Sequence, residues 1–222
     1  MRKNEAKVLT DVNAGDRHFV TSLQKGLDVL TCFGRQHSRL TLSEVARLTG
    51  MSPASARRSL LTLHQLGYLD SDGKRFWVQP RALLVAHAYL SSRPMPSLAQ
   101  PLLDALSERT RESASLGQLQ GDDAIIVARS TARRSLSLGL GIGSRLPAYC
   151  SALGRVLLAG LPPAEAAARV RAMRRVPLTP KTVYSVPRVL ELVERCREEG
   201  YASNEGELEI GVRSMAVPLN DR

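Results

Sequence analysis

The sequence predicts an α+β protein of two domains, and three observations point to this fold class. The chain has 222 residues, which is long enough for two separate hydrophobic cores. Its first part has helix-like periodicity followed by two short strand-like runs, and its second part mixes longer strand-like and helical runs. The proline pair in Arg93-Pro94-Met95-Pro96 cannot continue a helix, so we take it as the domain boundary.

The N-terminal domain is predicted to span residues 19–80 and to follow a disordered tail. Residues 1–18 are polar and of mixed charge, which is typical of a loose terminus. The segment from Phe19 to Gln36 is expected to be the first helix, because its apolar residues recur on one helical face. These residues are Leu23, Leu27, Leu30 and Phe33.

A two-helix motif is predicted from Thr41 onward. A short helix with an apolar face begins at Leu42 and ends at Gly50. Ser52 is a good N-cap for the second helix, and Pro53 fits its first position, where the missing N–H is not needed. The second helix is expected to bury Ala56, Leu60, Leu63 and Leu66, and to direct Ala54, Ser55, Arg57 and Arg58 outward near its N-terminal end.

Two short strands are predicted directly after these helices, around the turn Ser71-Asp72-Gly73-Lys74. Helices and hairpin together are typical of a winged helix-turn-helix, whose second helix enters the major groove of double-stranded DNA. Lys74 and Arg75 would then lie beside the DNA backbone. A helical hairpin used only for packing, with a solvated turn, is the alternative. The candidate DNA-binding residues are Ser52, Pro53, Ala54, Ser55, Arg57, Arg58, Lys74 and Arg75.

The charge of the chain supports a polyanionic partner. The formal net charge is +10, and residues 1–92 hold 13 Lys and Arg against 7 Asp and Glu. Cys32, Cys150 and Cys196 have no metal-ligand spacing, which favours a reduced cytoplasmic protein. The sequence has neither a signal peptide nor an apolar run that could span a bilayer, so no membrane partner is expected.

A connector is predicted over residues 81–96. Pro80 precedes a mostly apolar helical run that ends near Arg93. An apolar helix between two domains can pair subunits, and packing against its own domain is the alternative.

The second domain, residues 97–222, is predicted to mix strands and helices. It begins with an amphipathic helix over Ser97 to Arg111 that directs Leu98, Leu102, Leu103 and Leu106 inward. Strands are expected over Ala114 to Gln120, Ala124 to Ser130, Ser135 to Leu140, Tyr201 to Ser203 and Arg213 to Leu219. Further helices are expected over Ser151 to Ala159, Pro163 to Arg175 and Pro187 to Glu199.

An anion site is predicted where Pro147 to Arg155 leads into a helix. The free N–H groups of the first helical turn and the helix dipole favour a carboxylate there. Small residues let the ligand approach, glycines let the preceding loop bend, Arg145 can pair with the acid and Tyr149 can stack on a ring. The alternative is that Ser151 is only an N-cap, the glycines form an ordinary turn and Arg145 is solvated. The candidate residues are Gly143, Arg145, Tyr149, Ser151, Ala152 and Leu153.

No catalytic, metal or cofactor site is predicted. All four histidines lie before residue 97, so Cys150 has no histidine partner in its own domain and is expected to be a buried thiol. Glu205, Glu207 and Glu209 alternate and are interpreted as a solvated edge. The glycines of Gly139 to Gly143 are followed by Pro147 and not by a long helix, which disfavours a dinucleotide loop.

The chain resembles the IclR family of bacterial transcription regulators over nearly its whole length. The residues that carry this resemblance are SLQKGLDVL, LTLSEVARLTGMSPASARRSLLTLHQLGYL, GSRLPAYCSALGRVLLAG and ELEIGVRSMAVPL. With SASLGQLQGDDAIIVARS, the second half is similar to the branch that governs breakdown of protocatechuate, p-hydroxybenzoate and related aromatic acids.

The resemblance implies a winged helix-turn-helix that dimerises on a pseudo-palindromic operator, and a mixed α/β domain of GAF or profilin-like fold that binds a small organic acid. It implies a homodimer or a dimer of dimers, and it adds Asn204 and Ser214 to the effector pocket. Family members continue past Asn220-Asp221-Arg222 into one or two strands and a closing helix, so the C-terminal end is expected to be truncated.

The sequence therefore predicts a DNA-binding transcription regulator without enzyme activity, controlled by a small organic acid that is aromatic in this branch. Two alternatives remain. One is an effector-independent DNA-binding protein, and the other is a ligand-binding enzyme with an accessory helical domain.

Overall fold

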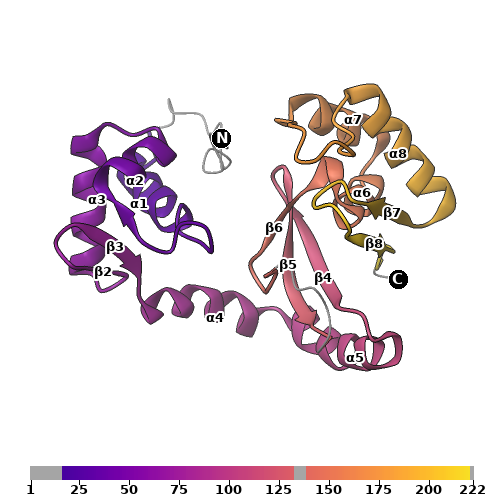
Figure 1. The fold of residues 1–222 in the computed structure, drawn as a ribbon, viewed down its shortest axis with the longest axis horizontal. Helices are drawn as coiled ribbons and strands as arrows, with labels where there is room; N and C mark the ends of the chain where they lie inside the picture. Colours follow the sequence, from indigo (N-terminus) through magenta and orange to yellow (C-terminus); the bar gives the residue numbers. More distant parts are fainter. Residues whose placement is uncertain (1–16, 133–138, 221–222) are drawn as a thin grey trace. The chain divides into compact units, whose positions relative to one another are not determined.

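The computed structural model describes residues 17–132 and 139–220, and the chain divides into two compact units, residues 1–93 and 94–222 (Figure 1). Each unit has its own hydrophobic core. Most of the expected tail lies outside the described residues, as do positions 135–138 of the expected strand Ser135 to Leu140.

The first unit combines helices with a small antiparallel sheet of strand order β1-β3-β2. Helix α3 follows α2 after a short turn, and the β2–β3 hairpin follows α3, so the predicted winged helix-turn-helix is confirmed. In chain order its elements are α1 (Thr21–Thr31), β1 (Leu40–Thr41), α2 (Leu42–Thr49), α3 (Pro53–Gln65), β2 (Leu69–Ser71), β3 (Arg75–Val78), the 3-10 turn η1 (Pro80–Ala82) and α4 (Leu83–Ser92).

Local hydrogen bonds define the ends of α2. The Thr41 hydroxyl accepts from the Glu44 N–H at 3.3 Å, and the Glu44 carboxylate accepts from the Thr41 N–H at 2.8 Å, forming a capping box. Gly50 ends the helix in the left-handed region at φ 69°, which glycine adopts without a steric penalty. The chain can therefore turn within a few residues into α3.

The core of the first unit lies between α1, α2 and α3. Val29, Val45, Ala56 and Leu60 are fully buried, one or two from each helix. Leu69 of β2 closes this core from the sheet side. The apolar positions that the sequence predicts for α2 and for most of α3 therefore form one cluster.

Three predicted core positions of this unit are wrong. Helix α1 is shorter than the expected Phe19 to Gln36, and its buried residue in the core is Val29. Leu23 and Leu27 are 62% and 53% exposed, because α1 contacts the cluster near its C-terminal end, through Val29 and Leu30. Leu66 is 50% exposed, because it is the C-cap residue of α3, past the last full turn.

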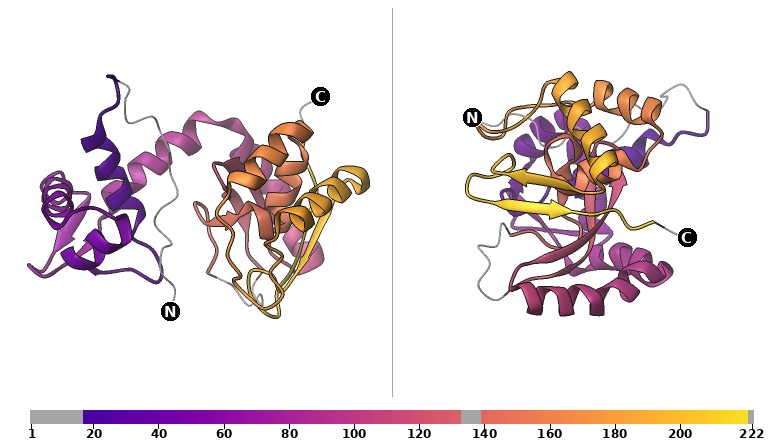
Figure 2. Two further views of the ribbon diagram at one scale, coloured as in Figure 1. Left: turned by 90° about the horizontal axis from the view of Figure 1, so that it is seen from above. Right: turned by 90° about the vertical axis from the view of Figure 1, so that its right-hand side faces the viewer.

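The second unit packs helices on both faces of a three-stranded antiparallel sheet of order β4-β5-β6. Helix α5 contacts β4 and β5, and α6 contacts β4, β5, α8 and the β7–β8 hairpin beside it (Figure 2). Its elements are α5 (Pro94–Thr110), β4 (Ala114–Gln120), β5 (Asp123–Ser130), β6 (Arg145–Pro147), the 3-10 turn η2 (Ala148–Cys150), α6 (Ala152–Ala159), α7 (Pro163–Ala172), α8 (Val186–Glu199), β7 (Ala202–Glu205) and β8 (Arg213–Ala216).

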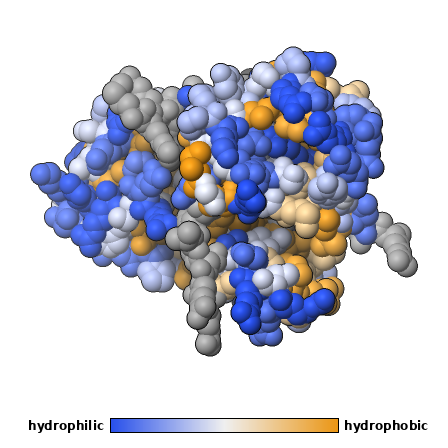
Figure 3. Space-filling view, turned by 45° about the vertical axis from the view of Figure 1, so that its right-hand side comes forward, coloured by the Kyte–Doolittle hydropathy of each residue, from blue (hydrophilic) through white to orange (hydrophobic). Residues whose placement is uncertain are grey.

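The leucine face predicted for α5 does not face the core. Leu98 and Leu102 are 68% and 73% exposed, and Leu106 is 47% exposed. Small residues pack against the sheet instead, with Ala99 and Ser107 among the buried positions of the helix. The exposed leucines contribute to the apolar surface of this unit, and apolar patches stand among hydrophilic ones in Figure 3.

The proline pair does not form a linker after a helix, as the sequence suggested, because α5 begins at Pro94 itself. Proline is tolerated in the first turn of a helix, where the N–H has no intrahelical partner. Arg93 is extended and ends α4, so the break falls one residue before the first proline.

None of the helices in the described ranges has the length and apolar character needed to cross a membrane.

The N-terminal turn of α6 packs closely on η2 and requires a glycine. A Cβ on Gly154 would lie 2.2 Å from the Ala148 Cα and 2.6 Å from its carbonyl oxygen, well inside van der Waals contact. Because both atoms belong to the backbone, neither can move aside cheaply. The close approach of α6 to η2 therefore depends on this position.

Gly154→Ala should lower the free energy of unfolding by about 1–3 kcal/mol, the cost of overpacking a tight site. Gly160→Ala is the matched control, because a Cβ there meets nothing closer than 3.5 Å and the backbone is right-handed. Urea unfolding of both variants checks this. Equal stability of the two variants would contradict the close contact.

Candidate functional sites

The N-terminal end of α3 presents two arginines to solvent. Ser52 is the N-cap, and its hydroxyl accepts from the Ser55 N–H at 3.3 Å, with Pro53 at the first helical position as predicted. Arg57 and Arg58 are exposed on the face opposite the buried Ala56. The exposed residues at this helix end are Ser52, Pro53, Ala54, Arg57 and Arg58.

Ser55 is not part of that surface, which corrects the sequence prediction. It is 7% exposed and lies beside Ala56 on the core side of the helix. Its N–H completes the cap of α3, so its contribution is to helix geometry.

The turn between β2 and β3 is held by Asp72. Its carboxylate accepts the N–H groups of Arg75 at 2.7 Å and Lys74 at 3.0 Å, and these bonds hold the pKa of Asp72 below its usual range. Gly73 takes a left-handed φ of 89° at the tip. The side chains of Lys74 and Arg75 are exposed, so the wing carries two cations on a shaped turn.

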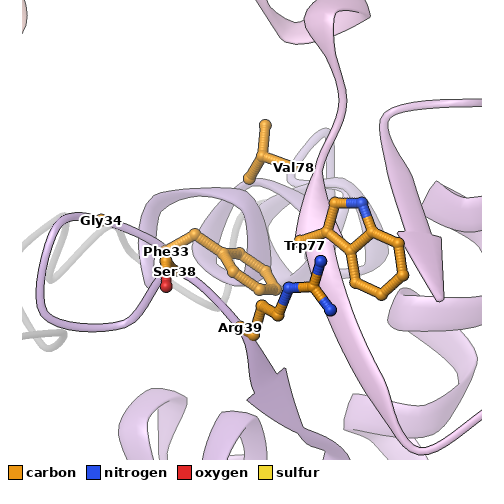
Figure 4. A pocket seen from close by; sticks show the side chains of 6 residues that line it. All are labelled: Phe33, Gly34, Ser38, Arg39, Trp77 and Val78. Atoms are coloured by element: carbon orange, nitrogen blue, oxygen red, sulfur yellow. The ribbon is translucent and has the colours of Figure 1, made fainter. Parts of the chain in front are cut away.

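A third cation of the wing sheet was missed by sequence reasoning. The Arg39 guanidinium lies 4.3 Å from the centroid of the Trp77 ring, a cation–π distance, beside a hollow of about 440 Å³ (Figure 4). The β1–β3 register pairs Leu40 with Phe76, which brings the preceding Arg39 opposite Trp77. Because β1 has only two residues, the sequence pattern does not reveal this strand or its partner.

The predicted anion site of the second unit gathers Tyr149 and Ser151 at the start of α6, but their polar atoms are already bonded. The Ser151 hydroxyl donates to the Pro147 carbonyl at 2.8 Å and accepts from the Gly154 N–H at 3.1 Å, as an N-cap does. The Tyr149 hydroxyl donates to the Val176 carbonyl at 2.7 Å, and burial raises the pKa of Tyr149 to about 12.

Arg145 is paired with a carboxylate of the chain. Its Nε donates to Asp123 Oδ2 at 2.8 Å, and Nη2 bonds to the same oxygen, so the predicted ligand for an acid is neutralised across β5 and β6. Gly143 precedes β6 with a left-handed φ of 84° and is exposed. Leu153 lies on the sheet side of α6, against Gly117, and the neighbouring Ala152 is buried.

Asn204 and Ser214 face each other across the β7–β8 pair but differ in environment. Asn204 is buried, and its amide donates to the Cys150 carbonyl at 2.5 Å and accepts from the Glu207 N–H at 3.4 Å. Ser214 is exposed. Only the first of the two is therefore tied to the start of α6.

Sequence reasoning missed a buried ion pair, Arg155–Glu207. The Arg155 Nη1 and Nη2 atoms each donate at 2.7 Å to a different oxygen of Glu207, a bidentate pair. The Tyr149 carbonyl and the Val183 N–H complete this network. Glu207 is 7% exposed, so the prediction that it lies on a solvated edge is wrong. The pair ties α6 to the turn that follows β7.

The three cysteines of the chain are buried thiols. Burial raises the pKa of Cys150 to about 12, so this side chain stays protonated near neutral pH and is a poor nucleophile. Across residues 17–132 and 139–220, no three His, Cys, Asp or Glu side chains gather closely enough to hold a metal ion.

Comparison with protein families matches both units of the chain. Residues 22–73 match the IclR helix-turn-helix domain, and residues 87–222 match the C-terminal domain of the bacterial transcriptional regulator IclR. The chain belongs to the IclR family of bacterial transcriptional regulators. The match to the helix-turn-helix domain includes the capped α3 and the start of the wing, so it contains the exposed Arg57 and Arg58.

Among curated relatives, the chain is 38% identical to the Pca regulon regulatory protein of Pseudomonas putida, over 93% of this chain and 72% of that protein. It is 35% identical to the p-hydroxybenzoate hydroxylase transcriptional activator of Acinetobacter baylyi, over 90% of this chain and 76% of that protein. These relatives confirm the resemblance to the branch of aromatic-acid regulators.

Among solved structures, a transcriptional regulator from Rhodococcus sp. RHA1 is 42% identical with a TM-score of 0.72, and the match covers 91% of this chain and 81% of that one. An IclR homologue from Microbacterium hydrocarbonoxydans, solved in complex with 4-hydroxybenzoate, is 22% identical with a TM-score of 0.70, over 90% and 83% of the two chains. At 22% identity, the match to the Microbacterium homologue shows a shared fold alone.

Glu207→Gln should lower the free energy of unfolding by about 3–5 kcal/mol, because it leaves the buried Arg155 guanidinium without a compensating charge. The double variant Arg155→Met with Glu207→Gln should lose less stability than the sum of the losses in Arg155→Met and Glu207→Gln. Chemical denaturation in a double-mutant cycle measures this coupling.

Glu205→Gln is the control for that cycle. Glu205 pairs with Lys181 and Arg213 at the exposed surface, where solvent screens the charges. The midpoint of thermal unfolding of the Glu205→Gln variant should therefore stay nearly unchanged. Additive effects of Arg155 and Glu207 would show that the bidentate pair does not form.

Proposed function

We propose that this protein regulates transcription by placing the N-terminal end of α3 in the major groove of an operator. The observation that carries this proposal is the pair of exposed arginines on a capped helix, within a motif that matches the family's helix-turn-helix domain. Arg57 reads base edges, Arg58 contacts a phosphate, and Lys74 and Arg75 contact the backbone from the wing. Ser52, Pro53 and Ala54 allow the close approach of the helix end.

We further propose that the protein acts as a homodimer or a dimer of dimers on a pseudo-palindromic operator. The proposal is supported by α4, which has no buried residue although most of its side chains are apolar. Leu83, Leu84 and Val85 are each more than 60% exposed, so this helix does not use its own unit to cover them. A two-fold arrangement of winged helices matches the symmetry of a palindromic site.

The second unit is proposed to bind a small aromatic acid that controls DNA binding, without catalysis. The regulators named for the Pca regulon and for p-hydroxybenzoate hydroxylase support this ligand class, as does the 4-hydroxybenzoate bound by the Microbacterium homologue. The pocket is proposed at the start of α6, between this helix, the glycine loop and the β7–β8 hairpin. Its proposed residues are Gly143, Arg145, Tyr149, Ser151, Ala152, Leu153, Asn204 and Ser214. The protein would act in the cytoplasm, where its DNA lies.

Arg57→Ala should weaken binding to the promoter of the regulated genes and alter base preference, with little effect on random duplex DNA. Arg58→Ala should weaken binding to all duplexes and flatten the salt dependence of log K by about one unit, because one phosphate contact is lost. Fluorescence anisotropy over a range of salt concentrations measures both effects.

Arg171→Ala is the charge-matched control, because this exposed arginine of α7 lies in the other unit. If Arg57→Ala weakened specific and random DNA equally, Arg57 would have a phosphate role. If the unaltered protein retarded no promoter fragment at low salt, the proposed function would be wrong.

Addition of 4-hydroxybenzoate should change the affinity of the protein for its operator at least severalfold. A ligand shifts a conformational equilibrium only through its different affinity for the two states, so the change in DNA affinity measures that difference. Titration of an operator complex with the acid measures the shift. Binding of the operator that no aromatic acid alters would favour the effector-independent alternative.

A further inference from the structure

The described arginines that are withdrawn from solvent in the second unit have defined partners, with one exception. Arg155 is paired with Glu207, and the partly buried Arg169 is paired with Glu165. Arg175 donates to the carbonyls of Val170, Met173 and Tyr184, and Arg197 donates to Glu194 and to the carbonyls of Ala159 and Leu161. The exception is Arg129 of β5.

Arg129 is a half-buried cation without a counter-charge among the described residues. Its Nη1 donates to the Ser115 hydroxyl at 2.6 Å, and its Nε is buried and has no partner in the described part of the chain. Burial is the one cause that shifts its pKa, and it lowers it, with no opposing contribution from a nearby carboxylate. An uncompensated charge in such a place is costly unless something binds to it.

The position of Arg129 brings this charge to the same side of the sheet as α6. Ser115 and Arg129 are cross-strand partners and therefore share a face. Gly117 lies two residues along β4, and Leu153 of α6 packs against it. The extra residue of the irregularity between these positions is in β5, so the alternation of β4 places Ser115 and Gly117 on one face. The strands β4 and β5 that carry the pair are seen as a long hairpin in Figure 1.

The glycine loop runs along the neighbouring edge of β5. The Gly143 N–H donates to the Ile126 carbonyl at 2.8 Å, and the Ile126 N–H donates to the Ser144 carbonyl at 3.0 Å. These bonds extend the β5–β6 pairing toward the end of β5 that carries Arg129. Arg129 therefore lies three residues along β5 from the position at which the glycine loop pairs, and this loop leads into the predicted acid site at the start of α6.

We propose that Arg129 binds the carboxylate of the small organic acid, with Ser115 holding its guanidinium in place. The inference rests on the proposed function and names the residue that recognises the acid. Ser115 occupies the Nη1 side, which leaves the edge formed by Nε–H and Nη2–H. This edge matches the two oxygens of a carboxylate through parallel charge-assisted hydrogen bonds.

Arg129 fits this role better than Arg145. A carboxylate that bound Arg145 would have to displace Asp123, which already accepts from Nε and Nη2 of that arginine. The acid at Arg129 displaces no charge of the described chain and supplies the missing bond to Nε. The acid group is then recognised by Arg129 of the sheet, and the start of α6 lines the pocket beside it.

The test is calorimetric titration of the full chain with 4-hydroxybenzoate and with 4-hydroxybenzamide, its uncharged counterpart. The unaltered protein should bind the acid and bind the amide at least tenfold more weakly. Arg129→Gln should weaken acid binding by about 10- to 100-fold, the effect of losing charge-assisted bonds, and Arg129→Lys should recover part of it. Ser115→Ala should weaken it less, because it removes only the support of the guanidinium.

Arg171→Gln on α7 is the control variant. Arg145→Gln is the rival-site variant, because it removes the other arginine that the sequence proposes as the ligand of the acid. Circular dichroism and operator binding without acid show that each variant is folded, and the acid–amide comparison needs no variant. If Arg129→Gln bound the acid as tightly as the unaltered protein, or if Arg145→Gln alone lost binding, the Arg129 proposal would be overturned. If the unaltered protein bound operator but no aromatic acid, the effector part of the proposed function would fail first, and the Arg129 site with it.

Discussion

Charge withdrawn from water must be matched by an opposite charge or by hydrogen bonds, and this constraint organises the second unit. The Arg155–Glu207 pair satisfies it completely, because the two side chains meet through two bonds and the backbone covers their remaining polar atoms. That pair joins α6 to the turn after β7. The same constraint makes Arg129 conspicuous, since its Nε has no partner in the described chain. In our proposal, a bound acid supplies the missing counter-charge of Arg129.

A different constraint governs the first unit, where the polar groups at the helix ends are satisfied locally. The capping box at Thr41 and the cap at Ser52 define α2 and α3 before any distant contact forms. The small core then fixes the angle between the helices and leaves Arg57 and Arg58 on the solvent side. Asp72 shapes the wing in the same local way, through the N–H groups that follow it. The proposed DNA-binding surface therefore follows from short-range signals.

This difference explains how much of the molecule could be predicted from its sequence. Caps, a proline at the first helical position and turn glycines lie within a few residues of the element they define, so α2, α3 and the hairpin were predicted correctly, as was the strand Ala114 to Gln120. The Arg155–Glu207 pair joins residues 52 positions apart, so no local sequence pattern predicts it. Arg39 meets Trp77 only through the register of a two-residue strand. The face of α5 was predicted wrongly because leucines at helical spacing indicate an apolar face without saying what covers it, whereas Ala99 is small enough to touch the sheet.

The crystal structure of the protein in complex with 4-hydroxybenzoate tests the charge-balance account most directly. The account predicts that the two carboxylate oxygens lie within hydrogen-bond distance of Nε and Nη2 of Arg129, while Arg145 keeps its pairing with Asp123. A carboxylate seated on Arg145 with Asp123 displaced, or held only by the first N–H groups of α6, would contradict it.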